Sequence, residues 1–487
     1  MYAASPVSSA AASGRLKVQI NTSPYLSEID FSPVDRLQGS QLSLDLVSLA
    51  DLLRTSFVYP PHSIYREVKL AGTGFDPAQD LHDHPSYHYP FQSAMASLRP
   101  LAKTVDESEL LKKYHHLLCH AVANATANMR APWLFQSGGK DSTALAIALA
   151  EARPDTCCYT YLGGNEENEV PSARRVASKL GLRHEALVCD PARAYDRYLA
   201  ILPRLPLLTA DFAVLSYVDL VTEVRAQGGD GIIDGIGADE YCGAPLHARE
   251  HLLGLLARGI PLPSALFTSG VVSRSFKLCF ALSTLQMHAF ERYFPGSRFS
   301  DAEVDGLLGR KLSAGSRRRL ALFRPDIDAA QSKEAVRRIA LTIVESGQLA
   351  KGMYIAKAMS LRLAYPYCYE PLRDWVFHCV PDDHLIGPGG VNKVLMRNYI
   401  AQHFKQLPYV QSKGCFRFDL CCLASRRFDQ VRDFAEQARD VMPGAPAWLD
   451  AHRAVLGNKY FASKFYLLAV VLPWLLGRMR GAKSQAE

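Results

Sequence analysis

The sequence lacks several patterns that would each point directly to a class of protein. None of its eleven cysteines forms a CxxC pair, which excludes the usual zinc ribbon and thioredoxin-like redox motifs. No GxxxxGK[ST] sequence is present, so a Walker A nucleotide loop is excluded. Internal repeats, low-complexity tracts and an uninterrupted apolar run long enough to span a bilayer are missing as well.

The cysteines and the apolar segments favour a cytoplasmic protein without a membrane partner. Adjacent cysteines at 157–158 and 421–422 have a poor geometry for disulfides, so buried reduced thiols are expected. Residues 1–15 lack the apolar core of a secretory signal and are expected to form a flexible tail. The most apolar segment, 465–476, is short and contains Pro473, which favours a buried helix near the C-terminus.

The length and the charge set further limits. A chain of 487 residues predicts two or three domains, each able to bury a core. The net charge of +7 is spread along the chain, and the densest basic cluster is Arg317–Arg319. We expect this cluster to be a solvated helix face, because no basic tail or RNA-binding motif accompanies it. Nucleic acid is therefore not an expected partner.

The most informative feature that is present is the sequence SGGKDS at 137–142. It follows the apolar residues 133–135 and opens the Ala-rich run 143–150, which predicts a strand, a glycine turn and a helix. Such a turn presents backbone N–H groups to an anion, and phosphate is the natural guest. Asp141 would repel a bare phosphate, so we expect it to hold Mg²⁺. A plain Gly-Gly turn at a helix start is the alternative interpretation.

Residues 130–240 alternate between predicted strands and predicted helices. This order predicts a doubly wound parallel sheet, in which ligands bind at the carboxyl ends of the strands. The predicted strands are 133–136, 156–162, 184–189 and 231–234, and the predicted helices are 142–152, 170–180 and 211–226. Outside this region, helices are expected at 42–53 and 107–128, a strand at 64–70, and mostly helices after residue 245.

A second glycine turn, DGIGADE at 234–240, follows the predicted strand at 231–234. Carboxylates in such a turn suit a second Mg²⁺ contact or the substrate side of a nucleotide. Asp239 is the candidate metal ligand, and Gly235 and Gly237 are candidate nucleotide-binding residues. A plain surface turn is equally compatible with this stretch alone.

As a collinear set, these segments resemble the asparagine synthetase family, whose SGGxDS motif is that of the N-type ATP pyrophosphatases. Residues 234–243 are similar to its SGEGADELFGG segment and 360–367 (SLRLAYPY) to its SLEARVPF. Residues 389–393 resemble GG.tK and 412–416 resemble K.GF. The resemblance divides the chain into a tail (1–15), a degenerate, shortened glutaminase-like domain (16–125) and an α/β ATP-binding synthetase domain with a helical C-terminal part (126–487).

The resemblance implies a ligase that uses ATP and Mg²⁺ to adenylate a carboxylate, releases pyrophosphate and couples the acyl group to an amine. Lys393 and Lys413 would hold pyrophosphate and neutralise charge in the transition state, and Asp141 and Asp239 would hold the metal. Attack on the α-phosphorus spreads negative charge over phosphate oxygens, so fixed cations there lower the barrier. The implied phosphate-binding residues are Ser137, Gly138, Gly139, Asp141 and Ser142.

Three residues depart from the family pattern. Tyr2 stands where the nucleophilic cysteine of the glutaminase domain would be, so we expect no ammonia to be made from glutamine. Ile236 stands where asparagine synthetases have Glu and β-lactam synthetases have Tyr, and an alkyl group cannot accept a proton. Arg362 replaces the Glu of SLEAR, the partner of that Tyr.

These departures suit relatives that use an amine other than ammonia, such as the lasso-peptide macrolactam cyclases, which resemble asparagine synthetase and close a peptide. The substrates would then be a small-molecule or peptide carboxylate and amine, with a precursor peptide and a protease as partners. Glu240, Tyr241 and Tyr367 are the candidate replacement bases. The alternatives are an asparagine synthetase that uses free ammonia, a PP-loop tRNA-modifying enzyme and an inactive nucleotide-binding homologue.

Overall fold

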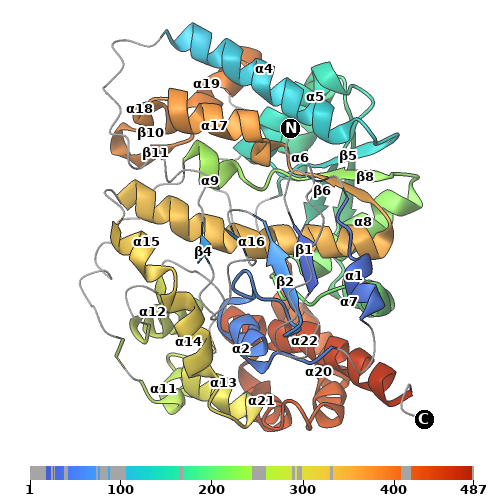
Figure 1. Cartoon of the computed structure of the whole chain (residues 1–487), viewed down its shortest axis with the longest axis vertical. Coiled ribbons are helices and arrows are strands. Elements are labelled where there is room, and N and C mark those ends of the chain that lie inside the picture. Colours follow the sequence, from blue (N-terminus) through green and yellow to red (C-terminus); the bar gives the residue numbers. More distant parts are fainter. Residues whose placement is uncertain are drawn as a thin grey trace.

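The computed structural model shows an α/β part and a helical part that share one body (Figure 1). The residues that the structure describes are 18–22, 26, 28–37, 42–72, 75–76, 86–87, 106–163, 168–243, 259–260, 262–287, 291–292, 299–329, 333–406, 408 and 418–484.

A parallel sheet of five strands lies at the centre of the α/β part. In the order β7-β6-β5-β8-β9, every strand runs parallel to its neighbour. The strands are β5 (Pro132–Phe135), β6 (Cys157–Leu162), β7 (Arg183–Val188), β8 (Gly231–Ile233) and β9 (Arg362–Ala364). The chain moves outward from β5 to β7 and then returns to the other side of β5, so the strand order reverses between β5 and β8. Loops that follow these two strands meet in the crevice where α/β proteins bind ligands.

Helices cover both faces of this sheet. Leu134, Cys158 and Ile233 point into a core shared with α4 and α5, whereas Trp133 and Cys157 pack against α8. This alternation is the period of two that a strand buried on both faces requires. The helices concerned are α4 (Glu107–Thr126), α5 (Lys140–Ala152), α6 (Val170–Lys179), α7 (Pro191–Ile201) and α8 (Val214–Ala226). The predicted doubly wound α/β sheet is confirmed.

Element boundaries differ from the predictions by a few residues, and a side-chain cap explains one of these differences. Asp45 accepts a hydrogen bond from the N–H of Val47, so the helix predicted at 42–53 is α2 (Leu46–Thr55). Asp106 caps α4 in the same way, and α4 ends at Thr126 instead of 128. The strand predicted at 64–70 is β2 (Val68–Ala71), which pairs in parallel with β1 (Val18–Asn21).

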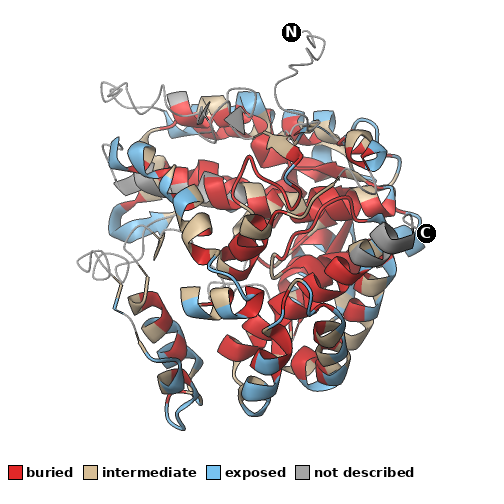
Figure 2. Ribbon diagram, turned by 60° about the horizontal axis from the view of Figure 1, so that its bottom comes forward, coloured by how far each residue is buried: buried red, intermediate tan, exposed pale blue. Residues whose placement is uncertain are grey.

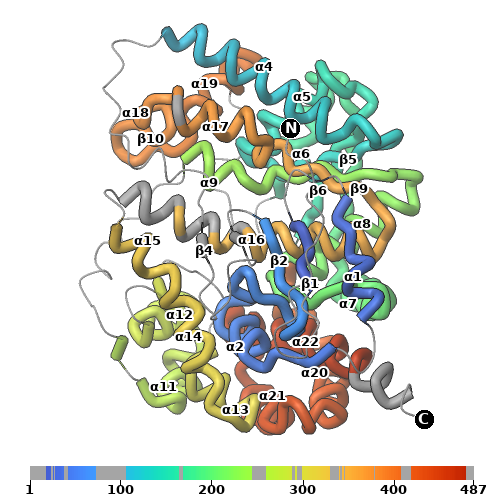
Figure 3. Tube along the Cα trace, in the orientation of Figure 1, coloured from blue at the N-terminus to red at the C-terminus, as the bar shows by residue number. Residues whose placement is uncertain are grey.

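The N-terminal segment shares its core with helices from the far end of the chain (Figure 3). Buried residues run through the middle of the molecule, as Figure 2 shows in red. The rings of Tyr65 and Trp474 are 5.7 Å apart, and those of Phe31 and Tyr354 are 5.6 Å apart. The short elements of this segment are α1 (Ser32–Arg36), β3 (Phe75–Asp76) and β4 (Ser86–Tyr87). The domain boundary at residue 125 stays a prediction.

The basic cluster at 317–319 also joins these two regions. Arg319 is largely buried on α14 (Ser313–Ala321), where it lies 2.5 Å from Asp45 and 3.0 Å from Asp51. Arg317 pairs with Asp301 at 2.8 Å. The prediction of a solvated face is therefore wrong for Arg319, because its guanidinium donates hydrogen bonds to the carboxylates of Asp45 and Asp51.

The last helix of the helical part is α22 (Lys459–Ser484). Its stretch Lys459–Arg478 is long and apolar enough to cross a bilayer, but 89% of the apolar window is buried within the fold. The predicted buried C-terminal helix is thus confirmed as a core helix. The other helices of this part are α11 (Ser264–Thr268), α12 (Phe276–Leu285), α13 (Asp301–Leu308), α15 (Arg324–Ala329), α16 (Lys333–Met359), α20 (Leu420–Gln437) and α21 (Ala445–His452). Four more helices contribute to the core around α4 and α5: α9 (Ala238–Cys242), α17 (Glu370–Cys379), α18 (Asp382–Leu385) and α19 (Val394–His403).

Candidate active site

The SGGKDS loop joins β5 to α5 and offers an N–H group to a negatively charged oxygen. The N–H of Gly138 donates to a carboxylate oxygen of Glu169 at 3.2 Å. A side chain at 138 would crowd this contact, because an added Cβ would lie 3.0 Å from the Cβ of Glu169. The loop therefore already binds an anionic group, which fits its predicted use for phosphate.

Hydroxyl groups within the loop hold its shape. Ser142 donates its hydroxyl to the carbonyl of Ser137 at 2.8 Å, and Thr143 donates to the carbonyl of Gly139 at 2.8 Å. The N–H of Gly139 donates to the hydroxyl oxygen of Ser137 at 3.3 Å. The two predicted phosphate-binding serines thus first serve to fix the backbone that carries the N–H groups.

The second glycine turn, between β8 and α9, lies against this loop. A methyl group added to Gly235 would lie 3.7 Å from the Cβ of Asp141, so the two turns are in near contact. Gly237 has a φ of +101°, a conformation that glycine adopts far more readily than other residues. This turn places Asp239, whose side chain is 58% exposed, at the start of α9.

Lys393 joins the two turns. Its side chain is only 2% exposed, and its ammonium lies 2.6 Å from Asp141 and 2.5 Å from Asp239. Burial alone would lower the pKa of Lys393, but Asp141 and Asp239 raise it above its ordinary value, so the lysine stays charged. Lys393 precedes α19 in a left-handed conformation with φ of 57°.

Asp141 and Asp239 thus both contact the ammonium of Lys393, and their carboxylates lie close together. Mg²⁺ prefers carboxylate and phosphate oxygens, and this donor set beside an anion-binding loop fits that ion. Asp141 and Asp239 would hold it, and Lys393 would remain beside the phosphates. The structure brings together three of the four charged residues predicted here; Lys413 lies outside the described residues.

The candidate bases occupy different surroundings. Tyr367 donates its hydroxyl to the carbonyl of Asp141 at 2.7 Å, and burial raises its pKa well above the ordinary value. In this structure Tyr367 therefore positions the loop, and its role as a base stays a prediction. Tyr241 is buried edge-on against Phe377, with ring centres 5.6 Å apart. Glu240 is buried on α9 beside Asp239, and its role as a base stays a prediction.

The departures from the family pattern lie in two places. Arg362 begins β9 opposite Gly231 and lies 3.4 Å from Asp230, at the amino ends of the strands. It is therefore at the edge of the sheet away from the two turns. Ile236 lies in the second turn itself and packs partly buried against the main core.

Glu169 is the residue that sequence reasoning missed. It directly precedes α6, in the loop that follows β6, the strand next to β5. One signal in the sequence could have indicated this role. Glu169 is an acidic residue that follows the carboxyl end of the strand next to β5.

Comparison with known proteins places these motifs in a family. The family model described as "Asparagine synthase" matches residues 113–438, which is more than half of the chain. This match supports an ATP-dependent, amide-forming ligase of the PP-loop type. A comparison with curated proteins gave no match.

Similar solved structures include NMN synthetase from Francisella tularensis (15% identity, TM-score 0.24, covering 51% of this chain and 97% of that one). NAD+ synthetase from Burkholderia pseudomallei is similar at 17% identity and a TM-score of 0.20, covering 53% of this chain and 94% of that one. Likenesses this weak carry no argument about function, and the family match stands without them. The chain belongs to the asparagine synthase family.

Proposed function

We propose that the protein activates a carboxylate with ATP, releases pyrophosphate and transfers the acyl group to an amine other than ammonia. The observation that carries this proposal is the contact of buried Lys393 with Asp141 and Asp239 at the reversal point of the sheet. Fixed charges of both signs beside an anion-binding loop are what cleavage between the α and β phosphates requires.

Each half of the site has a separate task in this proposal. The N–H groups of the SGGKDS loop bind phosphate oxygens. The phosphate then replaces the carboxylate of Glu169 as the acceptor of the Gly138 N–H. Mg²⁺, when bound, supplies charge neutralisation between the phosphates and the carboxylates of Asp141 and Asp239. Lys393 donates to the departing pyrophosphate, and Lys413 is proposed to assist from the segment after α19. Tyr367 donates its hydroxyl to the carbonyl of Asp141 and so holds the backbone of the loop in place.

The amine-transfer half differs from that of an asparagine synthetase. Ile236 offers no proton acceptor in the second turn. An amine that reaches the site already deprotonated, or that transfers its proton to Glu240, is compatible with these residues. We therefore propose lactam or macrolactam formation, in which carboxylate and amine belong to one small molecule or peptide.

The first test is the identity of the phosphate product. Incubation with ATP, Mg²⁺ and peptides that carry an internal Asp or Glu and a free N-terminus should release pyrophosphate. The peptide product should be lighter by one water molecule. N-acetylated peptides should still support exchange of labelled pyrophosphate into ATP, but they should give no lactam.

Three results would count against this function. Release of ADP and inorganic phosphate alone would exclude adenylation. Asparagine formed from aspartate and ammonium would favour the asparagine synthetase alternative. Absence of exchange with every carboxylate, in a chain that still binds ATP, would favour an inactive homologue.

A further inference from the structure

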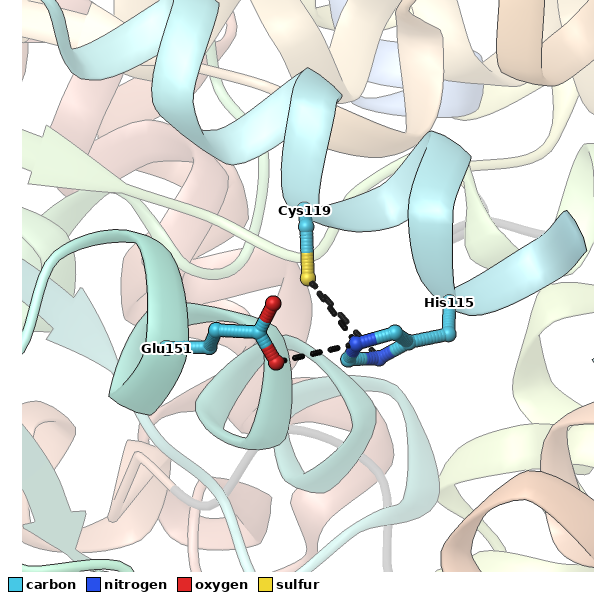
Figure 4. A group of neighbouring side chains, drawn as sticks. All are labelled: His115, Cys119 and Glu151. Atoms are coloured by element: carbon cyan, nitrogen blue, oxygen red, sulfur yellow. Dashed lines mark hydrogen bonds and ion pairs between the residues drawn. The ribbon is translucent and has the colours of Figure 1, made fainter. Parts of the chain in front are cut away.

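A second group of reactive side chains lies apart from the nucleotide-binding turns, where α4 packs against the end of α5. His115 and Cys119 are one helical turn apart on α4, and Glu151 lies in the last turn of α5 (Figure 4). The three side chains point toward one another, and their donor atoms all lie within 4.8 Å of one another. Glu151 is about 17 Å along α5 from the first turn of that helix, so this group is not part of the active site.

Two of the three donor-atom spacings are near those around a small tetrahedral ion, and the third, between Glu151 and Cys119, is at most 4.8 Å. Nε2 of His115 lies 3.0 Å from Oε2 of Glu151 and 3.6 Å from Sγ of Cys119. Zinc bonds of about 2.0–2.1 Å to nitrogen or oxygen and about 2.3 Å to sulfur put these pairs about 3.3 and about 3.5 Å apart. Little movement of the side chains would therefore be needed to place an ion between them.

A buried tyrosine holds the histidine ring from behind. Nδ1 of His115 lies 2.8 Å from the hydroxyl of Tyr399, which is fully buried on α19. Metal-binding histidines engage their second nitrogen in a hydrogen bond of this kind, which fixes the ring and its tautomer. With Nδ1 bonded to Tyr399 as a donor, Nε2 directs its lone pair at the carboxylate of Glu151. A cation or a proton must then lie between these two atoms.

We propose that His115, Cys119 and Glu151 form a zinc site with three protein ligands and a fourth position open to solvent. An imidazole nitrogen, a thiolate and a carboxylate suit Zn²⁺, whereas Mg²⁺ and Ca²⁺ take oxygen ligands. Zinc displaces the proton of the Cys119 thiol, and the thiolate and carboxylate then balance the charge of the ion. The carbonyl end of α5, which has no basic residue in its last turn, adds a partial negative charge.

The bound ion would hold neighbouring helices together. It ties α4 to the end of α5, and Tyr399 extends the tie to α19, the helix that directly follows Lys393. Of these helices, α5 carries Asp141 in its first turn, and Lys393 directly precedes α19.

The test uses the full chain with zinc and with cobalt. After loading with ZnCl₂ and dialysis, the wild-type chain should retain one zinc per molecule by elemental mass spectrometry. Replacement by Co²⁺ should produce a thiolate-to-metal charge-transfer band in the near ultraviolet. Cys119→Ser should abolish the band, and His115→Gln should abolish retention of the metal. Tyr399→Phe should weaken zinc binding by about 10- to 100-fold, as loss of a ring-orienting partner does elsewhere.

Two variants serve as matched controls. His116→Gln removes the next histidine of α4, which is exposed and faces His120, and Cys379→Ser removes an exposed thiol of α17. Both should bind zinc and cobalt as the wild type does. A wild-type chain that retains no zinc, or whose cobalt form lacks the thiolate band, overturns the proposal without recourse to any variant. Equal retention by the His115→Gln chain overturns it as well.

Discussion

Replacement of Lys393 by methionine tests the charge arrangement on which the proposed function rests. The substitution keeps the length of the side chain and removes the ammonium that lies 2.6 Å from Asp141 and 2.5 Å from Asp239. Two carboxylates then remain close together without the ammonium that lay between them. We expect the folded state to lose stability and ATP–pyrophosphate exchange to be abolished.

The expected magnitude follows from the burial of the lysine. Removal of one partner from a buried ion pair costs about 3–5 kcal/mol. The entropy of unfolding is about 2.1 cal/mol/K per residue, so 487 residues that unfold together lose about 1 °C in Tm for each kcal/mol. The Tm should therefore fall by about 3–5 °C without Mg²⁺. Because Asp141 and Asp239 would hold that ion, millimolar Mg²⁺ should restore a large part of the loss.

Lys464→Met is the matched control for this measurement. Lys464 is equally buried, with 3% of its side chain exposed, and lies 2.8 Å from Glu303 in the helical part. Its loss should lower the Tm to a similar extent, without recovery in Mg²⁺ and without loss of exchange. Thermal melts of both variants with and without Mg²⁺ decide the matter. Equal recovery in the two variants, or none in Lys393→Met, would refute a shared cation position between Asp141 and Asp239.

Three further predictions concern the loops and the sheet. Gly237→Ala forces a side chain into a φ of +101°, which should destabilise the fold by about 1–3 kcal/mol and impair ATP–pyrophosphate exchange. Gly228→Ala (φ +83°) should lower the stability alone, as thermal melts and exchange assays of both variants would show. Tyr367→Phe should raise the KM for ATP through a looser Asp141 loop, while Tyr365→Phe, which loses a buried hydroxyl bonded to α16, should leave the KM unchanged. Burial lowers the pKa of His184 to about 4 from 6.5, so only the unfolded chain takes up its proton between these values. Stability should fall as the pH drops from 6.5 to 4, and denaturant titrations of His184→Gln should show a shallower fall.

The sequence predicts the sheet and its two turns because these depend on local pattern. Strand, glycine turn and helix can be recognised within a dozen residues, and the strand-end rule then brings Asp141 and Asp239 together. The approach of Lys393 could be proposed only from the family resemblance, since it joins Asp141 across 252 residues. The burial of Arg319 was missed because its carboxylate partners on α2 lie far away in the sequence.

Register and side-chain direction account for the remaining differences. Arg362 lies at the amino end of β9 because it is paired with Gly231, and no motif specifies that pairing. The hydrogen bond from the hydroxyl of Tyr367 to the carbonyl of Asp141 could not be predicted either, because no motif gives the direction of that side chain. A motif match predicts which residues lie close together, whereas the backbone register determines at which end of a strand they lie.

The separation of Asp141 and Lys393 along the chain also sets the time that passes between their synthesis on the ribosome. A ribosome that adds about 5–20 residues per second needs about 13–50 s to synthesise the 252 residues that separate them. During that interval α5 and the SGGKDS turn can form, because their contacts are local, but the carboxylate of Asp141 has no ammonium to meet. The nascent chain therefore carries an incomplete nucleotide site for about half of its synthesis, and the site is completed only as α19 emerges.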